Sequence, residues 1–108
     1  MVKSTLVPAL ATVTLALHAF VAVADDVPVL NVSALCRAEA KEAPEFSKAC
    51  MADQNRARED LVRQWTQFAP DSRARCTAMV TSIAGAQSYV ELLTCLQVAR
   101  DVKSLPKE

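Results

Sequence analysis

The stretch "GAQSYVELLTCLQVARDV", residues 85–102, decides the fold because it predicts an amphipathic helix with a cysteine on its apolar face. Ser88 and Glu91 form the S-x-x-E pattern of a capping box, which marks the beginning of a helix. Gly85, the only glycine, is expected to end the preceding helix in the left-handed conformation. The apolar face of the predicted helix consists of Leu92, Cys95, Leu96, Ala99 and Val102.

Three further helices are expected upstream, over residues 32–42, 44–68 and 72–84. Asn31 or Ser33 is a candidate N-cap for the first helix, and Asp71 for the third. Pro44 should end or kink the first helix and suits the first turn of the second. The predicted apolar stripe of the second helix, interrupted only by Asp53, is Phe46, Cys50, Ala57, Leu61, Trp65 and Phe68. That of the third is Cys76, Met79, Val80 and Ile83. Strands have little support, because alternation of β-branched residues is nearly absent.

The four cysteines allow three pairings, and the helix breaks choose among them. Cys76 and Cys95 are equidistant from the Gly85 turn, and Cys36 and Cys50 are equidistant from the Pro44 break. Residues equidistant from the turn of an antiparallel hairpin lie level with each other. A link between Cys50 and Cys76 would have to span about 19 Å along the helix axes. The sequence therefore predicts Cys36–Cys50 and Cys76–Cys95 bridges, each stabilising the fold by about 3 kcal/mol. The expected fold class is all-α: a small four-helix protein of two disulfide-stapled helical hairpins.

Residues 1–24 have the pattern of a cleaved secretory signal peptide. Lys3 precedes an apolar stretch over residues 6–23, and Ala22-Val23-Ala24 is an A-x-A cleavage site. The remaining chain is expected to comprise an extended segment (25–30), a single helical disulfide domain (31–105) and a frayed tail (106–108). We therefore expect a periplasmic or secreted protein with no membrane insertion after cleavage.

Composition excludes several functional classes. The only histidine, His18, leaves with the signal peptide, so Ser-His-Asp and Cys-His catalysis are excluded. The C-x13-C, C-x25-C and C-x18-C spacings lack the close cysteine pair that holds zinc. The mature chain has 11 basic and 12 acidic residues, a net charge of −1, which gives no footprint for nucleic acid. We expect no catalytic residue, no metal site, no cofactor and no enzymatic activity.

Aromatic side chains are the candidates for partner contact, because exposed aromatics anchor interfaces. These candidates are Trp65, Phe68 and Tyr89. Trp65 and Phe68 continue the apolar stripe of the second helix, which favours core packing for them. Tyr89 lies at a helix start beside a turn, where burial and half exposure are equally expected. The oligomeric state and the identity of a partner stay open.

The string "SYVELLTCL" (88–96), with "RARC" (73–76) and Trp65 upstream, resembles a group of small exported bacterial four-cysteine helical proteins without an assigned function. A weaker resemblance is to the LprI-like lysozyme-inhibitor family. It rests on the four cysteines together with Trp65 and Arg100. The chain departs from that family in its wide C-x13-C spacing and in the Pro70-Asp71 turn. The second resemblance implies an exported helical domain that inhibits lysozyme.

These observations favour a non-catalytic binding or inhibitory module of the cell envelope, with an envelope or extracellular protein as its partner. The alternative is a structural or stress-protective periplasmic protein that acts like a small chaperone. A binding module should expose an apolar or aromatic patch of more than a few hundred Å², expected near Tyr89 and the Gly85 turn.

Overall fold

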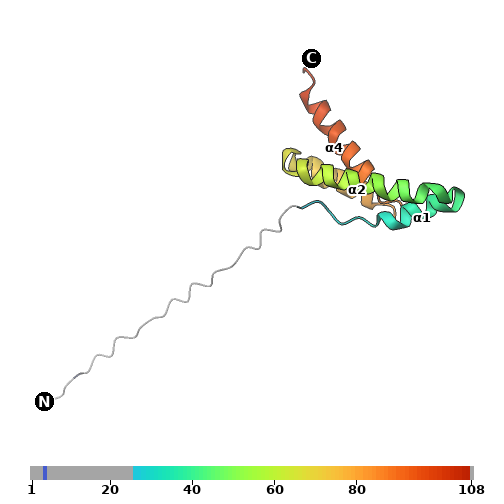
Figure 1. Ribbon diagram of the computed structural model, residues 1–108. Helices are drawn as coiled ribbons and strands as arrows, with labels where there is room; N and C mark the ends of the chain where they lie inside the picture. The colour runs from blue at the N-terminus through green and yellow to red at the C-terminus, as the bar shows by residue number, and fades with distance from the viewer. Residues whose placement is uncertain (1–3, 5–25, 108) are drawn as a thin grey trace.

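Helices make up all of the regular secondary structure in the described residues. The computed structural model describes residue 4 and residues 26–107 (Figure 1). The elements, in chain order, are α1 (Val32–Glu42), η1 (Pro44–Phe46), α2 (Ser47–Gln64), η2 (Trp65–Gln67), α3 (Pro70–Thr81) and α4 (Tyr89–Ser104). This confirms the predicted all-α class. The predicted signal peptide lies outside the described residues, apart from residue 4.

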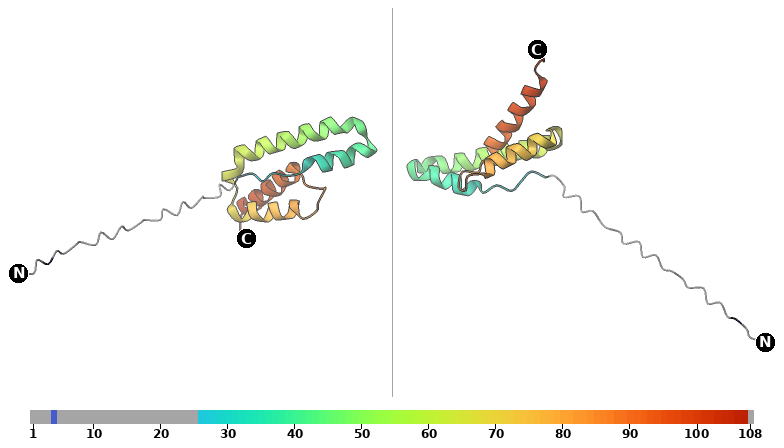
Figure 2. Two further views of the ribbon diagram at one scale, coloured as in Figure 1. Left: turned by 90° about the horizontal axis from the view of Figure 1, so that it is seen from below. Right: turned by 180° about the vertical axis from the view of Figure 1, so that it is seen from behind.

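The helices form two antiparallel hairpins, each closed by a disulfide. α1 runs along α2, and α3 runs along α4 (Figure 2). Cys36 is bonded to Cys50 with a Cα–Cα distance of 5.6 Å, and Cys76 to Cys95 with 5.8 Å. Both distances lie in the range of about 4.4–6.8 Å that a disulfide requires. The predicted pairing is therefore confirmed, and all four cysteines are used.

Capping side chains fix the starts of two helices. The Asn31 side chain accepts a hydrogen bond from the backbone N–H of Ala34 at 3.4 Å, so Asn31 is the N-cap of α1. The Ser88 hydroxyl accepts one from the N–H of Glu91 at 3.2 Å, which is the cap expected for α4. Each cap satisfies a backbone donor that has no partner within its own helix.

The bounds of α3 differ from the prediction. Asp71 is not its N-cap, because the helix begins at Pro70, two residues earlier than predicted, and Ala69 is the capping residue. Proline suits this first position, since it lacks the N–H that would be unsatisfied there. The helix ends at Thr81 rather than at Ala84. Gly85 adopts a φ of +83°, as expected of a left-handed residue, but it lies in the turn beyond the helix.

The predicted helix over residues 44–68 consists of three elements, η1, α2 and η2. Phe46, assigned to its apolar stripe, is 57% exposed. It belongs to η1 at the tip of the first hairpin, which Figure 1 shows to be remote from α3 and α4. Nothing at that tip covers the ring. The remaining five residues of the predicted stripe are buried.

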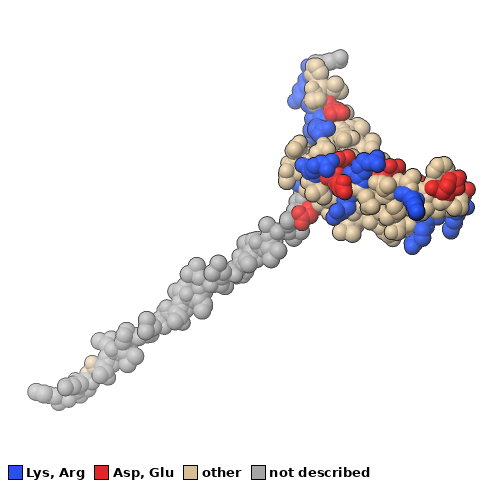
Figure 3. All heavy atoms as spheres, viewed as in Figure 1, with Lys and Arg blue, Asp and Glu red and all other residues tan. Residues whose placement is uncertain are grey.

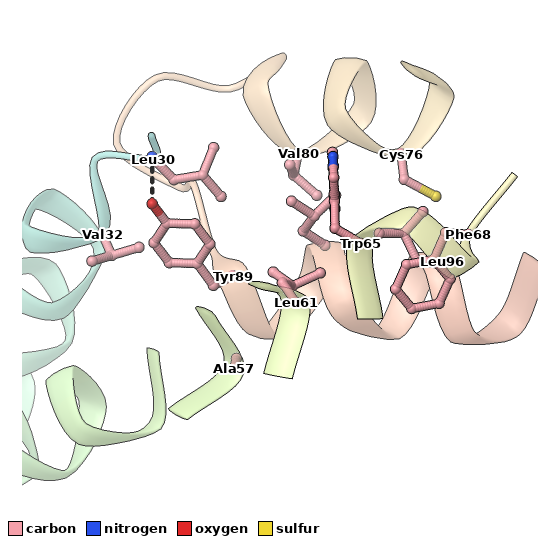
Figure 4. Close-up of a cluster of buried hydrophobic side chains, with 11 residues drawn as sticks. Leu30, Val32, Ala57, Leu61, Trp65, Phe68, Cys76, Val80, Tyr89 and Leu96 are labelled. Carbon is pink, nitrogen blue, oxygen red and sulfur yellow. Dashed lines mark hydrogen bonds between the residues drawn. The ribbon is translucent and has the colours of Figure 1, made fainter. Parts of the chain in front are cut away.

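The core lies where α2 crosses the second hairpin, and the segment before α1 covers its edge (Figure 4). Leu61 of α2 and Leu92 and Leu96 of α4 have no exposed surface. Burying each of these side chains stabilises the fold by about 1.5–3 kcal/mol. Cys76 belongs to the same cluster, so its disulfide lies at the edge of the core. The other buried members are Leu30, Val32, Ala57, Trp65, Phe68, Val80 and Tyr89.

Three residues that were expected in the core are exposed. Met79, Ile83 and Val102 are 62%, 64% and 60% exposed, respectively. They carry the correct helical spacing, but they lie on the flank of the second hairpin away from the core, where no other described helix packs. The prediction was wrong for them because periodicity identifies an apolar face without showing whether anything covers it.

Candidate binding surface

The three aromatic candidates for partner contact are core side chains (Figure 4). Trp65, Phe68 and Tyr89 are only 5%, 2% and 4% exposed. The guanidinium of Arg73 lies 5.6 Å from the centre of the Trp65 ring, and that of Arg100 lies 5.4 Å from the centre of the Phe68 ring. These cations cover the rings from outside, in cation–π geometry. Tyr89, for which burial and half exposure were equally expected, is buried, and none of the three rings offers a surface to a partner.

The hydroxyl of Tyr89 holds the segment that precedes α1. It accepts a hydrogen bond from the N–H of Leu30 at 3.0 Å and donates one to the carbonyl of Pro28 at 3.1 Å. Nearby, the side-chain oxygen of Gln87 accepts from the N–H of Asn31 at 2.8 Å. We name residues 26–31 the N-terminal strap. The hydroxyl of a buried tyrosine needs a hydrogen-bond partner, and here the N-terminal strap supplies both a donor and an acceptor.

Gln54 of α2 caps the second hairpin from outside and was missed by sequence reasoning. It is 5% exposed, and its side-chain oxygen accepts from the N–H of Tyr89 at 2.7 Å and from that of Val90 at 3.4 Å. Its amide nitrogen donates to the hydroxyl of Ser88 at 2.9 Å. The N-terminal donors of α4 are therefore used within the protein, and Gln54 has a structural role.

A stripe of exposed aliphatic side chains follows the second hairpin. An α-helix turns by about 100° per residue, which places Met79 about 60° to one side of Cys76 and Val80 about 40° to the other. On α4, Val98 and Leu92 lie about 60° to either side of Cys95. Because the helices are antiparallel and joined through the disulfide, the flanks with Val80 and Leu92 both face the core. Met79 and Val98 therefore share the outer side.

This outer side carries exposed aliphatic side chains, interspersed with polar residues such as Thr94 and Asp101. We name it the outer stripe and define it as Met79, Ile83, Val98, Val102 and Leu105, which are 62%, 64%, 56%, 60% and 64% exposed. Five side chains exposing on the order of 100 Å² each make a patch on the order of 500 Å². The largest apolar patches of monomeric proteins measure about 300–600 Å² and are often functional. Ile83, two residues from Gly85, places one end of the outer stripe at the turn where a patch was expected.

Charged side chains on α2 are interspersed by sign rather than gathered, as the face in Figure 3 shows. Asp53 pairs with Arg56 at 3.6 Å, and Asp60 pairs with Arg63. Both pairs join residues three apart along the helix and are largely solvated, so each contributes less than about 1 kcal/mol to stability. This face of α2 therefore has no strong field of one sign with which to attract a charged partner.

Several hollows lie on the surface of the described residues. Open hollows of about 460, 280 and 260 Å³ lie beside the N-terminal strap, between α2 and α4, and between α1 and the start of α4, respectively. A fourth, of about 110 Å³, lies beside the C-terminal half of α4. Within residues 26–107 and residue 4, no three His, Cys, Asp or Glu side chains are grouped as metal ligands. No helix in that part of the chain is long and apolar enough to cross a membrane.

Comparison of the chain with protein-family models, with curated proteins and with solved structures found no match. The fold and the exposed surfaces described above are therefore the basis for a functional proposal. Two disulfides in a domain of this size are typical of proteins that fold in an oxidising compartment outside the cytoplasm.

Proposed function

We propose that the protein is a non-catalytic binding module of the cell envelope or the extracellular space, and that the outer stripe is its contact surface. The observation that supports this proposal is the exposure of five aliphatic side chains along one side of a disulfide-braced hairpin. Apolar patches of this size are typical of protein–protein contact sites. The disulfide holds the two helices in register, so little conformational entropy is lost when a partner binds.

The proposed partner is a protein that presents apolar side chains in a groove or along a helix. The outer stripe includes residues from both arms of the second hairpin, which suits contact with a complementary ridge of side chains. The resemblance to lysozyme inhibitors makes lysozyme one specific partner to test. The described residues contain no histidine. Asp53 and Asp60 of α2 are each paired with an arginine of the same helix, which supports a role without catalysis.

The test compares the wild-type oxidised protein with a Met79→Lys, Val98→Lys double variant and a matched control. Val62→Lys is the control, because Val62 is as exposed as Val98, at 56%, but lies on α2 outside the outer stripe. A partner captured from an envelope extract is purified, and its affinity for all three proteins is measured. Charging the outer stripe should weaken binding at least tenfold, about 1.4 kcal/mol, while the control binds like wild type. Equal binding by the double variant would remove the outer stripe from the proposal.

The lysozyme variant of the proposal is tested in a cell-wall lysis assay. Wild-type protein and the Val62→Lys control should slow lysis, whereas the double variant should not. Lysis at the same rate with and without wild-type protein excludes this partner but leaves other partners of the outer stripe open.

A chaperone-like role is the second candidate, because the same exposed aliphatic side chains could hold unfolded chains. That role predicts that acid reversibly exposes further apolar surface, detectable with a dye that fluoresces on it. It also predicts weak binding to many unfolded proteins rather than tight binding to one. No increase in dye fluorescence between pH 7 and pH 3 would exclude this candidate and leave the binding module.

A further inference from the structure

The cavity of about 110 Å³ beside the C-terminal half of α4 has an apolar floor and a basic rim. Phe68 and Leu96 form the floor; they are 2% and 0% exposed and lie next to each other in Figure 4. Arg100, Lys103 and Gln67 surround the opening. The cavity lies in the angle between α4 and the start of α3, on a side of α4 about 160° from Val98 of the outer stripe. It is therefore a separate surface.

Ser72 of α3 places an unused hydroxyl in the wall of this cavity. The residue is only 6% exposed, and it lines the cavity. Its hydroxyl makes no hydrogen bond to any other residue between 26 and 107. A hydroxyl in the wall of the cavity can donate a hydrogen bond to a polar atom of a ligand or accept one from it.

The rim favours a ligand with a single negative charge. Lys103 is held by the carboxylate of Asp71, with 3.2 Å between Nζ and Oδ1, so its charge is already compensated. Arg100 uses one N–H to reach the side-chain oxygen of Gln64 at 3.3 Å. Its Nε lies 3.8 Å from Oδ1 of Asp101, beyond hydrogen-bond distance, and that carboxylate is 75% exposed and well solvated. Arg100 keeps most of its donors, and its planar group pairs best with a carboxylate.

The volume limits the size of the ligand. A cavity of about 150 Å³ accepts benzene, with six heavy atoms, so 110 Å³ accepts about four. We propose that this cavity binds the carbon atoms of a small aliphatic carboxylate of three or four carbons, with the two carboxylate oxygens at its open rim, either as a free acid or as the carboxyl end of a peptide chain. The carboxylate lies between Arg100 and the hydroxyl of Ser72, and the aliphatic group rests on Phe68 and Leu96.

The experiment follows the backbone amide signals of the oxidised protein by NMR during titration with sodium isobutyrate. Isobutyramide, of the same shape but neutral, and inorganic phosphate are titrated in parallel at constant pH and ionic strength. We expect saturable shifts around Phe68, Ser72 and Leu96, with a dissociation constant of about 1–10 mM for so small a ligand. Isobutyramide should bind at least tenfold more weakly, and phosphate should give no saturable shift at these residues.

Variants assign the contacts. Arg100→Gln should weaken isobutyrate binding at least tenfold, and Ser72→Ala about threefold. Arg56→Gln, a change of the same kind at a 73% exposed side chain on α2, should leave it unchanged. Because Arg100 also covers the Phe68 ring, Arg100→Lys provides a second variant that keeps the charge and loses the planar group. It should bind with intermediate affinity, and the fluorescence of Trp65 verifies that each variant is folded.

The source of the carboxylate is distinguished with the tripeptide Gly-Gly-Val, used with a free and with an amidated carboxyl end. Tighter binding of the free tripeptide than of isobutyrate assigns the cavity to peptide ends, and equal or weaker binding assigns it to free acids. The proposal is overturned if isobutyramide or phosphate binds as well as isobutyrate, if Arg100→Gln binds unchanged, or if the shifts map elsewhere. Because the cavity and the outer stripe are separate, failure here leaves the proposed binding module untouched.

Discussion

At the scale of single residues, long-range hydrogen bonds decide which side chains are buried. From its position in the sequence, Tyr89 could be either buried in the core or half exposed. The hydrogen bonds of its hydroxyl fix it in the core. The donor and the acceptor that it uses belong to residues 59 and 61 positions away in the chain. Such partners leave no mark in the local pattern of the sequence, so neither the burial of Tyr89 nor the N-terminal strap could be predicted from it.

Removing this hydroxyl should loosen the N-terminal strap. Tyr89→Phe keeps the ring but leaves the N–H of Leu30 and the carbonyl of Pro28 without their partner, which should cost about 1–3 kcal/mol of unfolding free energy. Denaturant unfolding followed by Trp65 fluorescence measures the loss, and hydrogen exchange of the Leu30 amide should accelerate. Val62→Ala, at an exposed position, should change stability by less than about 0.5 kcal/mol. Unchanged exchange at Leu30 in Tyr89→Phe would contradict the role assigned to the hydroxyl.

Gln54 is a second residue whose burial depends on partners that are distant in the sequence. It stands between Cys50 and Ala57 at helical spacing, so its position on the buried stripe of α2 was visible. The polar break was nevertheless assigned to Asp53, which is exposed. An unpaired amide in a core is costly, and its partners lie about 35 positions further on, at Ser88 and Tyr89.

At the scale of elements, one ion pair connects the start of α3 to the end of α4, at the open end of the second hairpin. Lys103 in the last turn of α4 reaches Asp71 in the first turn of α3. The hydrogen bond from Lys103 is the main reason why the pKa of Asp71 lies below its ordinary value of 3.8, and burial opposes the shift. A carboxyl group whose pKa is depressed by folding stabilises the fold at pH values above its unfolded pKa. That contribution is lost as the pH falls through the folded pKa.

The corresponding prediction concerns the titration of Asp71 itself. Its side-chain carboxyl signal, followed by NMR between pH 2 and pH 6, should give a pKa below 3.8 in the wild type. Lys103→Gln should raise that pKa toward its ordinary value, whereas Arg63→Gln, which affects the separate pair with Asp60, should not. Because the Asp71 side chain is 59% exposed, the accompanying change in acid stability is expected to be small. A measured pKa of 3.8 or higher for Asp71 in the wild type would contradict the role assigned to the ion pair.

The faces of the helices were predicted only in part, and the failures share a cause. The positions of the breaks at Pro44 and Gly85 sufficed for four helices and for the cysteine pairing, because these follow from local rules and symmetric spacing. These local rules do not show which parts of the second hairpin are covered by another helix. Met79, Ile83 and Val102 keep the apolar spacing where no described helix covers them, and they belong to the outer stripe instead of the core. The proposed carboxylate cavity was likewise invisible, because its walls come from distant segments.

At the scale of the whole molecule, the two disulfides support different parts of the protein. The second hairpin and α2 form the core between them, and Cys76 belongs to that core. The first hairpin projects from it, and α1 buries only Val32 and Cys36. The loops closed by the bridges are similar in length, with separations of 14 and 19 residues, so each contributes about 3 kcal/mol in the chain-entropy model.

Replacing each bridge by an alanine pair should therefore have distinct effects. The Cys36→Ala, Cys50→Ala variant should release α1 and η1 while the core stays protected. The Cys76→Ala, Cys95→Ala variant should lose protection throughout α2, α3 and α4. Hydrogen exchange followed by mass spectrometry, with the wild type as reference, resolves the two patterns. Uniform loss of protection in the first variant would show that α1 is needed for the core.

The N-terminal strap also has a consequence for the order of folding. During synthesis the chain emerges from its N-terminal end, and Val27, Leu30 and Val32 appear before any of the residues that will cover them. Tyr89 contributes to the site in which these side chains are buried, so they cannot be buried until most of the chain has been synthesised. A nascent chain stalled before α4 would leave these side chains in water together with much of α2. Completion of α4 is thus the event that shelters Val27, Leu30 and Val32 from water.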